Sequence, residues 1–420
     1  MRILHSSDWH LGQHFMGKSR EPEHRAFLGW LIEQVREQEV DAILVAGDIF
    51  DTGTPPSYAR RLYNHFIVEL HRTGCQLVVL GGNHDSVATL HESRELLACL
   101  ETRVVGGVTE VPEDQLVLLR RRDGRPGAVL CAVPYLRPRD LVESHAGESR
   151  EQKRQALVDA IGKHYTVIYE QACALRDRIM REQEEEGSNA ALLPVIATGH
   201  LTCVGGLLSE SVRDLYIGTL DAFPASAFPP ADYIALGHLH RAQQVGGQDH
   251  IRYSGSPIAL SFDEAGRPKQ VLLVDFDGQR LEAVTPLPVP VWQPMLSLGG
   301  DLDAIAAQLA ERFPGDSEAP LCWLEIEVQA DDYLSDLQQR VQALVEDLPV
   351  EVLRIRRRRR GEAAALAPEA RETLQELSVT EVFRRRLALE TLDEGAESRL
   401  TEAFDSLLAQ LHETGEEAGR

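Results

Sequence analysis

The chain has 420 residues, of which 43% are hydrophobic and 26% are charged, and its formal net charge is −23. A chain of this length can fold into one large domain and one or two small ones. Its acidity argues against a protein that coats nucleic acid with a uniformly basic surface. The 6 cysteines stand without close pairs, and no apolar run approaches the roughly 20 residues of a membrane span. Because the first strand-like run begins at residue 2, we also expect no secretory leader. We therefore expect a cytoplasmic protein that does not enter a membrane.

The first part of the chain alternates strand-like and helix-like segments. Apolar runs that read as buried strands cover residues 2–5, 41–46, 76–80, 194–198 and 232–236. Helical spacing of apolar residues predicts helices over residues 27–35, 57–70, 87–100 and 141–179, and residues 181–189 read as a polar loop. Strands at 129–133, 250–253 and 270–276 are expected to build a second sheet. The alternation predicts an α/β sandwich in which helices cover two sheets.

The last part of the chain reads as a separate unit followed by helices. Pro286, Pro288, Pro290 and Pro294 mark a linker. A helix at 302–313, a strand at 321–328, a helix at 333–348 and a strand at 350–355 then predict a small α/β domain that docks on the first. Apolar residues at helical spacing over 379–389 and 400–411 predict two amphipathic helices. Each would expose an apolar stripe unless it packs on the small domain or on a partner.

Metal-donor side chains follow all five of the strand-like runs. The motifs are D-x-H at residues 8–10, G-D-x-x-D at 47–51, G-N-H-D at 82–85, G-H at 199–200 and G-H-x-H at 237–240. Open α/β sheets place their chemistry in the loops at strand ends, and a glycine before a donor lets the backbone approach a ligand closely. A single histidine or Gly-Asp after a strand is usually structural. Five such motifs in one chain predict a two-metal site at one edge of the sheets.

The donor types indicate which metal this site would hold. The predicted ligands are Asp8, His10, Asp48, Asn83, His200, His238 and His240. Oxygen and imidazole donors without clustered thiolates favour Mn²⁺, with Mg²⁺ as a less effective substitute, over a structural zinc ion. We expect Asp48 to bridge two ions, with Asp8, His10 and His240 at one and Asn83, His200 and His238 at the other. A hydroxide between the ions would then attack phosphorus in line.

His84 is the predicted catalytic residue outside the ligand set. It follows the ligand Asn83 directly, so its ring is expected to face the substrate. An imidazolium in that place could stabilise a pentavalent phosphorus and protonate the leaving oxygen. The other histidines lack such a context and are expected to be packing or surface residues.

The series of five motifs resembles that of the calcineurin-like metallophosphoesterase superfamily. The segments S-D-W-H-L-G at residues 7–12 and G-S-P-I-A-L-S-F-D-E at 255–264 are similar to those of the SbcD nucleases, bacterial relatives of the eukaryotic Mre-eleven DNA-repair nuclease. This resemblance implies an α/β/β/α nuclease domain at 1–285, a DNA-contacting cap domain at 295–360, and a helical segment at 370–415 that binds the coiled coil of an SbcC-type ATPase. It also implies a homodimer, formed through the helices that follow Asp48 and Asn83. Asp51 stands where archaeal and eukaryotic members carry a histidine.

Three functions of different classes follow from these observations. The first is a Mn²⁺-dependent exonuclease and endonuclease that cuts double-strand DNA ends and hairpins under ATPase control, in DNA repair, recombination and replication at the nucleoid. The second is a non-catalytic scaffold that tethers DNA ends, against which the intact His84 argues. The third is a small-molecule phosphodiesterase, which would not need the cap or the C-terminal helices.

Overall fold

A computed structural model describes most of the chain up to residue 358. The described residues are 1–109, 111–142, 149–185, 192–204, 206–207, 212, 222–314, 320–329 and 336–358. Met1–Arg358 form one compact unit, and the structure describes nothing of residues 359–420. The helical segment predicted at 370–415 therefore lies outside the described residues.

The first of two large sheets carries the three N-terminal motifs. Its order is β14-β13-β1-β4-β5-β6, from β1 (Arg2–Ser6), β4 (Ala42–Val45), β5 (Gln76–Leu80), β6 (Thr102–Val105), β13 (Gln270–Asp277) and β14 (Arg280–Pro288). The strands β1, β4, β5 and β6 are parallel, and β13 lies antiparallel to β1. The expectation that 270–276 belongs to the second sheet is wrong. An ion pair of 2.8 Å between Arg2 Nε and Asp275 Oδ1 supports the pairing of β13 with β1.

The second sheet carries the two later motifs. Its order is β11-β12-β10-β9-β8-β7, from β7 (Leu116–Arg120), β8 (Pro126–Cys131), β9 (Val195–His200), β10 (Tyr233–Gly237), β11 (Gln243–Val245) and β12 (Gln248–Tyr253). The strands β8, β9, β10 and β12 run parallel. The strands expected at 129–133 and 250–253 are found here as β8 and β12. The carboxyl ends of β9 and β10 therefore lie side by side, as those of β1, β4 and β5 do in the first sheet.

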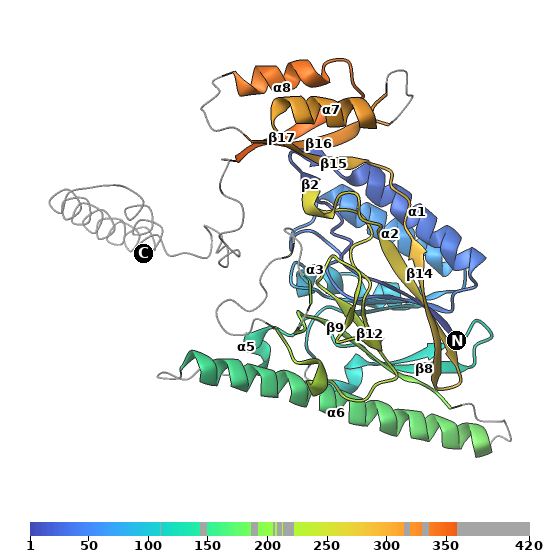
Figure 1. Ribbon diagram of the computed structural model, residues 1–420. Helices are drawn as coiled ribbons and strands as arrows, with labels where there is room; N and C mark the ends of the chain where they lie inside the picture. Colours follow the sequence, from blue (N-terminus) through green and yellow to red (C-terminus); the bar gives the residue numbers. More distant parts are fainter. Residues whose placement is uncertain are drawn as a thin grey trace, which may run out of the picture. The chain divides into compact units, whose positions relative to one another are not determined.

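Alternation along the strands explains why the two sheets stack. Ile3 and Leu44 point into a core that also holds Ala235 of the second sheet, whereas Leu4 and Ile43 point to the opposite face. That outer face is covered by α1 (Glu21–Glu37) and α2 (Ser57–His71), and the outer face of the second sheet by the long α6 (Arg150–Glu185) (Figure 1). The predicted α/β/β/α sandwich is confirmed.

Two helical predictions differ from the structure in their bounds. The helix expected at 87–100 is two short helices, α3 (Val87–His91) and α4 (Arg94–Ala98), and the second begins after Ser93. The polar loop expected at 181–189 is helical as far as Glu185. The arginine, glutamate and glutamine residues there have good helical propensity, so they extend α6 at its C-terminal end. The remaining short elements are β2 (His14–Phe15), β3 (Lys18–Ser19), α5 (Pro138–Leu141), and the 3₁₀ turns η1 (Pro112–Gln115), η2 (Ala225–Ala227) and η3 (Phe262–Glu264).

A small three-stranded sheet follows the sandwich. Its parallel strands β15 (Met295–Gly300), β16 (Cys322–Gln329) and β17 (Val350–Arg358) pack with α7 (Leu302–Arg312) and α8 (Leu337–Val345). The linker predicted from four prolines is partly wrong, because Pro286 and Pro288 continue β14. As the edge strand of its sheet, β14 tolerates residues that lack an N–H donor. The domain bounds 1–285 and 295–360 stay predictions. Among the described residues, no helix is both long and apolar enough to cross a membrane.

Candidate metal centre

The strand ends of both sheets meet at one cluster of donors. Asp8 follows β1, Asp48 follows β4, and the backbone N–H of His238 beyond β10 donates to Asp8 Oδ1 at 3.0 Å. In the described part of the chain, the donors form three groups, and the ligand atoms within each group all lie within 4.8 Å of one another. The groups are Asp8 with His10 and His240, His10 with Asp48 and His84, and Asp48 with His200 and His238. The structure thus brings the predicted residues of both sheets together.

The backbone at this cluster is strained. Asp8, His10, Asp48 and His238 have φ angles of 54°, 47°, 51° and 95°. Residues with a Cβ adopt the left-handed region at a cost of roughly 1–3 kcal/mol each, and such residues gather at functional sites. The surrounding fold therefore holds these donors in place against their local preference.

Two glycines of the motifs allow the donors to approach the backbone. A Cβ at Gly82 would overlap the carboxylate of Asp48, and one at Gly47 would overlap the ring of His200. Gly47 also has a φ of 91°, which favours glycine. The Gly-Asp and Gly-Asn pairs of the motifs are thus explained by close packing around Asp48.

Asp48 lies at the centre of the cluster and is 1% exposed. Its Oδ2 is 3.3 Å from His200 Nε2 and 3.6 Å from His10 Nε2, and its Oδ1 accepts the backbone N–H of His84 at 2.9 Å. Burial alone would raise the pKa of Asp48, but the imidazoles of His200 and His84 hold that pKa well below its usual range. Asp48 is therefore a buried anion that is shared by two of the three donor groups.

Three imidazoles of the cluster are held by their Nδ1 atoms. His10 Nδ1 is 3.2 Å from Asp51 Oδ1, His200 Nδ1 donates to the carbonyl of Ala46 at 2.9 Å, and His240 Nδ1 is 3.2 Å from Glu264 Oε1. Such partners fix the tautomer and leave Nε2 as the ligating nitrogen. The Nε2 of His10 is buried and has no hydrogen-bond partner. An orphaned imidazole nitrogen beside buried carboxylates fits a bound divalent cation.

The pKa values of two neighbouring histidines of the cluster are shifted in opposite directions. Burial lowers the pKa of His200, but the carboxylate of Asp48 outweighs burial and raises it to about 9. Burial and the neighbouring charge of His200 hold the pKa of His238 well below its usual range. A metal ligand must be a neutral imidazole, so metal binding would release the proton of His200.

Asn83 and His84 complete the cluster from the end of β5. Asn83 Oδ1 is 2.9 Å from His200 Nε2, and His84 Nδ1 donates to the carbonyl of Asp51 at 2.8 Å. The His84 and His10 rings meet edge to face with centroids 4.7 Å apart. A polar cavity of about 310 Å³ opens here, and its wall includes His84, His240 and Arg354. His84 thus borders both the donors and an accessible space.

Sequence reasoning did not assign a role to three carboxylates that support the donors. Asp51 contacts His10, and Glu264 contacts His240. Asp85 accepts the backbone N–H groups of Ile49, Phe50 and Gly82, and burial beside Asp48 raises its pKa to about 6. Each of the three is the last residue of a conspicuous motif, at 47–51, 82–85 and 255–264. Their position at motif ends was the available signal.

Comparison with known proteins identifies the family. Residues 1–242 match the calcineurin-like phosphoesterase family, and residues 291–391 match the type 5 capsule protein repressor C-terminal domain. The chain is 57% identical to the SbcD component of the SbcCD nuclease of Escherichia coli strain K12 over 98% of each chain. The chain belongs to the SbcD family of calcineurin-like phosphoesterases. Two more SbcD proteins support this. The SbcD protein of Rhodobacter capsulatus is 36% identical to this chain, and the match covers 88% of this chain and 91% of the relative. The SbcD protein of Bacillus subtilis is 31% identical, and the match covers 80% of this chain and 81% of the relative.

Membership of the SbcD family identifies the donor cluster as the candidate metal centre of a phosphoesterase. The resemblance read from the motifs is confirmed, and so is the prediction of a metal-dependent phosphoesterase of a nuclease family. A calcineurin-like phosphoesterase domain binds divalent metal, and the donor groups described above are its candidates in this chain.

Proposed function

We propose that this SbcD-family chain is a Mn²⁺-dependent nuclease that cuts double-strand DNA ends and hairpins. It would use two ions, one held by Asp8, His10 and His240 and the other by Asn83, His200 and His238, with Asp48 between them. The curated relatives bear the name of components of a nuclease, which supports this choice.

The observation that carries the proposal is the place of Asp48. This buried carboxylate contacts His200 at 3.3 Å and His10 at 3.6 Å, and these two imidazoles belong to separate donor groups. A carboxylate shared in this way is what a pair of ions needs as a bridge. Oxygen and imidazole donors without a thiolate favour Mn²⁺, and the neutral amide of Asn83 adds no charge to a site that must accept a phosphate.

His84 would supply the proton of the reaction. When bound, the ions would supply Lewis-acid charge to the scissile phosphate and activate the attacking water. The carbonyl of Asp51 accepts from His84 Nδ1, so Nε2 is the nitrogen that can pass a proton to the leaving oxygen. The backbone N–H of His84 donates to Asp48, which keeps the ring beside the donors.

Local charge would allow an acidic protein to hold DNA. Two divalent ions add four positive charges where the scissile phosphate docks, and the local field steers a substrate more than net charge does. Arg354 of β17 lines the same cavity as His84, and its guanidinium lies 5.4 Å from the centroid of the Phe262 ring. The small sheet thus presents an arginine beside the donors, where it could contact a neighbouring phosphate.

Cutting assays with three substrates test the proposal against its rivals. The purified protein is incubated with labelled double-strand ends, hairpin DNA and a nucleotide phosphodiester, in Mn²⁺ and in Mg²⁺. We expect cutting of both DNA substrates, faster with Mn²⁺. DNA binding without cutting would favour a tethering scaffold, and hydrolysis of the nucleotide alone would favour a small-molecule phosphodiesterase.

We also propose a partner for the C-terminal residues, which lie outside the described part of the chain. Apolar residues recur there at helical spacing; they are Leu400, Ala403, Phe404, Leu407, Leu408 and Leu411. The relatives are named as components of SbcCD, and the coiled coil of an SbcC-type ATPase would cover this stripe. Phe404→Asp should then abolish pull-down of the chain by that ATPase. The variant should still cut DNA at the wild-type rate in the absence of the ATPase. Unchanged pull-down with a lowered melting temperature of the isolated chain would show that the helices pack internally.

A homodimer is the third part of the proposal. The helices α2 and α3 follow the motifs at 47–51 and 82–85, and an isologous contact between such helices would pair two copies of the chain about a two-fold axis. Light scattering at tens of micromolar should give twice the mass of the chain. Mass of a monomer in the absence of the ATPase would show that dimerisation needs the partner.

A further inference from the structure

Glu264 is a buried carboxylate that contacts the predicted ligand His240 but has no part in the proposed reaction. It ends η3 (Phe262–Glu264) and is 3% exposed. Its Oε1 lies 3.2 Å from His240 Nδ1, and its Oε2 accepts from Lys269 Nζ at 2.6 Å and from the backbone N–H of Leu260 at 3.1 Å. A buried carboxylate that is bound on both oxygens is fixed in one orientation, so it can impose that orientation on His240.

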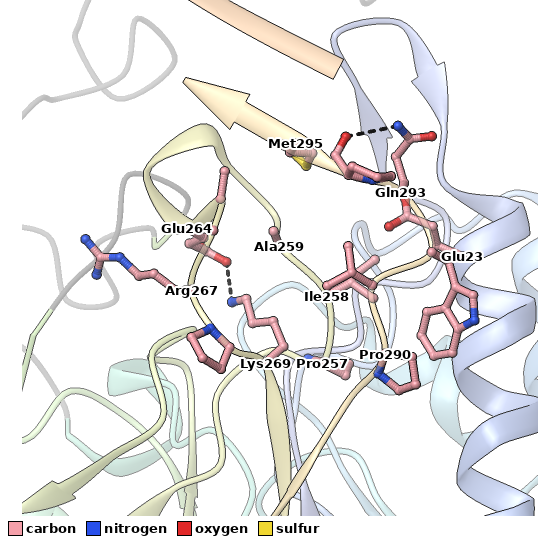
Figure 2. Close-up of a pocket in the computed structure, with 16 residues that line it drawn as sticks. Glu23, Pro257, Ile258, Ala259, Glu264, Arg267, Lys269, Pro290, Gln293 and Met295 are labelled. Carbon is pink, nitrogen blue, oxygen red and sulfur yellow. Dashed lines mark hydrogen bonds and ion pairs between the residues drawn. The ribbon is translucent and has the colours of Figure 1, made fainter. Parts of the chain in front are cut away.

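Lys269 contacts the backbone of the same histidine. Its Nζ donates to the backbone carbonyl of His240 at 3.1 Å and to Ser256 Oγ at 2.8 Å. Figure 2 shows the ion pair of Lys269 with Glu264 at the wall of a cavity of about 330 Å³, which is also lined by Ile258 and Pro290. Buried ion pairs contribute little net stability compared with apolar packing. A pair that contacts both the ring and the backbone of His240 is better explained by its hold on that residue.

We propose that Glu264 is a positioning residue of the metal centre, which fixes the His240 ring for metal binding and links it to the turn that contacts the small sheet. The inference rests on the proposed two-ion function. A carboxylate that accepts from Nδ1–H keeps the lone pair on Nε2, the nitrogen that Asp51 and the carbonyl of Ala46 leave for ligation in His10 and His200.

The other end of the turn explains the link to the small sheet. Phe262 stands two residues before Glu264 and packs with Phe15 and Trp323, with the Phe15 and Phe262 centroids 5.1 Å apart. The guanidinium of Arg354 from β17 lies 5.4 Å from the Phe262 centroid. A shift of β16 or β17 would therefore press on the same three-residue turn that holds His240.

Titration of the Glu264→Gln variant with Mn²⁺ tests the proposal. We expect the affinity of one of two ions to fall by roughly 10–100-fold, the usual effect of losing a partner of a ligating histidine. The other ion should bind as in the wild type. Cutting should recover in large part when Mn²⁺ is raised, because the variant weakens metal binding and leaves His84 in place.

Glu23→Gln is the matched control. Glu23 is also a buried carboxylate on the wall of this cavity (Figure 2). It accepts from Arg20 Nη2 at 2.9 Å, whereas Glu264 contacts the candidate ligand His240. Both variants should lower the melting temperature of the metal-free protein, but Glu23→Gln should leave both ion affinities unchanged. Equal loss of Mn²⁺ affinity in the two variants would overturn the proposal, since general destabilisation would then explain both.

The double variant Glu264→Gln/Lys269→Met separates positioning from the cost of an unpaired ammonium. Removing the ammonium should restore the melting temperature towards the wild type while the weakened ion stays weak. Recovery of full Mn²⁺ affinity would overturn the proposal, as would unchanged affinity in Glu264→Gln. A wild-type protein that binds no Mn²⁺ and cuts no DNA would instead contradict the proposed function, and with it the inference built on it.

Discussion

Two buried carboxylates, Asp48 in the donor cluster and Glu325 in the small sheet, show how differently the two regions use charge. Asp48 is 1% exposed and faces imidazoles and a backbone N–H. Glu325 on β16 is 6% exposed, and its carboxylate forms ion pairs with Arg354 and Arg356. The charge of Glu325 is balanced within the protein, whereas that of Asp48 is balanced only if its imidazoles carry protons or a cation binds.

The difference predicts where charge serves stability and where it serves chemistry. A buried anion with arginine partners has its charge balanced by the fold, and removing the anion disturbs that balance. A buried anion among imidazoles depends on what occupies the site, and strained backbone at Asp8, His10 and Asp48 is retained beside it. Substitutions in the two regions should therefore divide between metal content and unfolding free energy.

Asp48→Asn should have the largest effect. The change removes a carboxylate charge shared by two donor groups, so both ions should weaken together and cutting should fall by about 10⁴-fold or more. Calorimetric Mn²⁺ titration measures the loss directly. His10→Ala is the control and should weaken chiefly one ion. If Asp48→Asn loses a single ion, another residue is the bridge.

His84→Ala should separate metal content from rate. Its ring borders the cavity, so the variant should keep two ions and lose roughly 10²–10⁴-fold in cutting rate, the range for a removed general acid or electrostatic stabiliser. Metal analysis beside single-turnover kinetics measures both. His84 also lies within 4.8 Å of donor atoms of His10 and Asp48. A loss of stoichiometry in the variant would therefore place His84 among the ligands.

The sequence was most informative where a motif follows directly on a strand. Asp8 and Asp48 come within a few residues of β1 and β4, so the strand end and the donor are read from one local segment. The partner of β13 could not be read in this way, because the pairing of Arg2 with Asp275 joins residues 273 apart. The contact of Glu264 with His240 was hidden for the same reason. Short-range patterns predict which side chains end a strand but not which distant ones support them.

Glu325→Gln should affect stability and not metal binding. The variant removes the carboxylate that forms ion pairs with Arg354 and Arg356, whose side chains are 23% and 37% exposed. Because water reaches both guanidinium groups, we expect a loss of about 1–3 kcal/mol in unfolding free energy, less than for a fully buried pair. Denaturant unfolding in a chelator measures this. Unchanged stability, or a change in Mn²⁺ stoichiometry, would contradict the view that Glu325 contributes to stability whereas Asp48 serves metal binding.

His5 tests a buried polar group that is satisfied by hydrogen bonds alone. Its Nε2 donates to the carbonyl of Leu236 at 3.2 Å, so its Nδ1, at 3.0 Å, accepts from the hydroxyl of Tyr233. Burial lowers the pKa of His5 to about 3 from an ordinary 6.5. The folded protein therefore keeps a neutral ring at pH values where the unfolded chain has bound a proton. Since the unfolded state binds more protons, the unfolding free energy contributed by His5 is full above pH 6.5 and falls as the pH drops towards 3, by at most about 1.4 kcal/mol per pH unit.

Urea unfolding of the wild type and of His5→Gln between about pH 7 and pH 5 in a chelator should show a shallower decline in the variant. Parallel declines would mean that His5 takes up its proton in the folded protein as readily as in the unfolded chain.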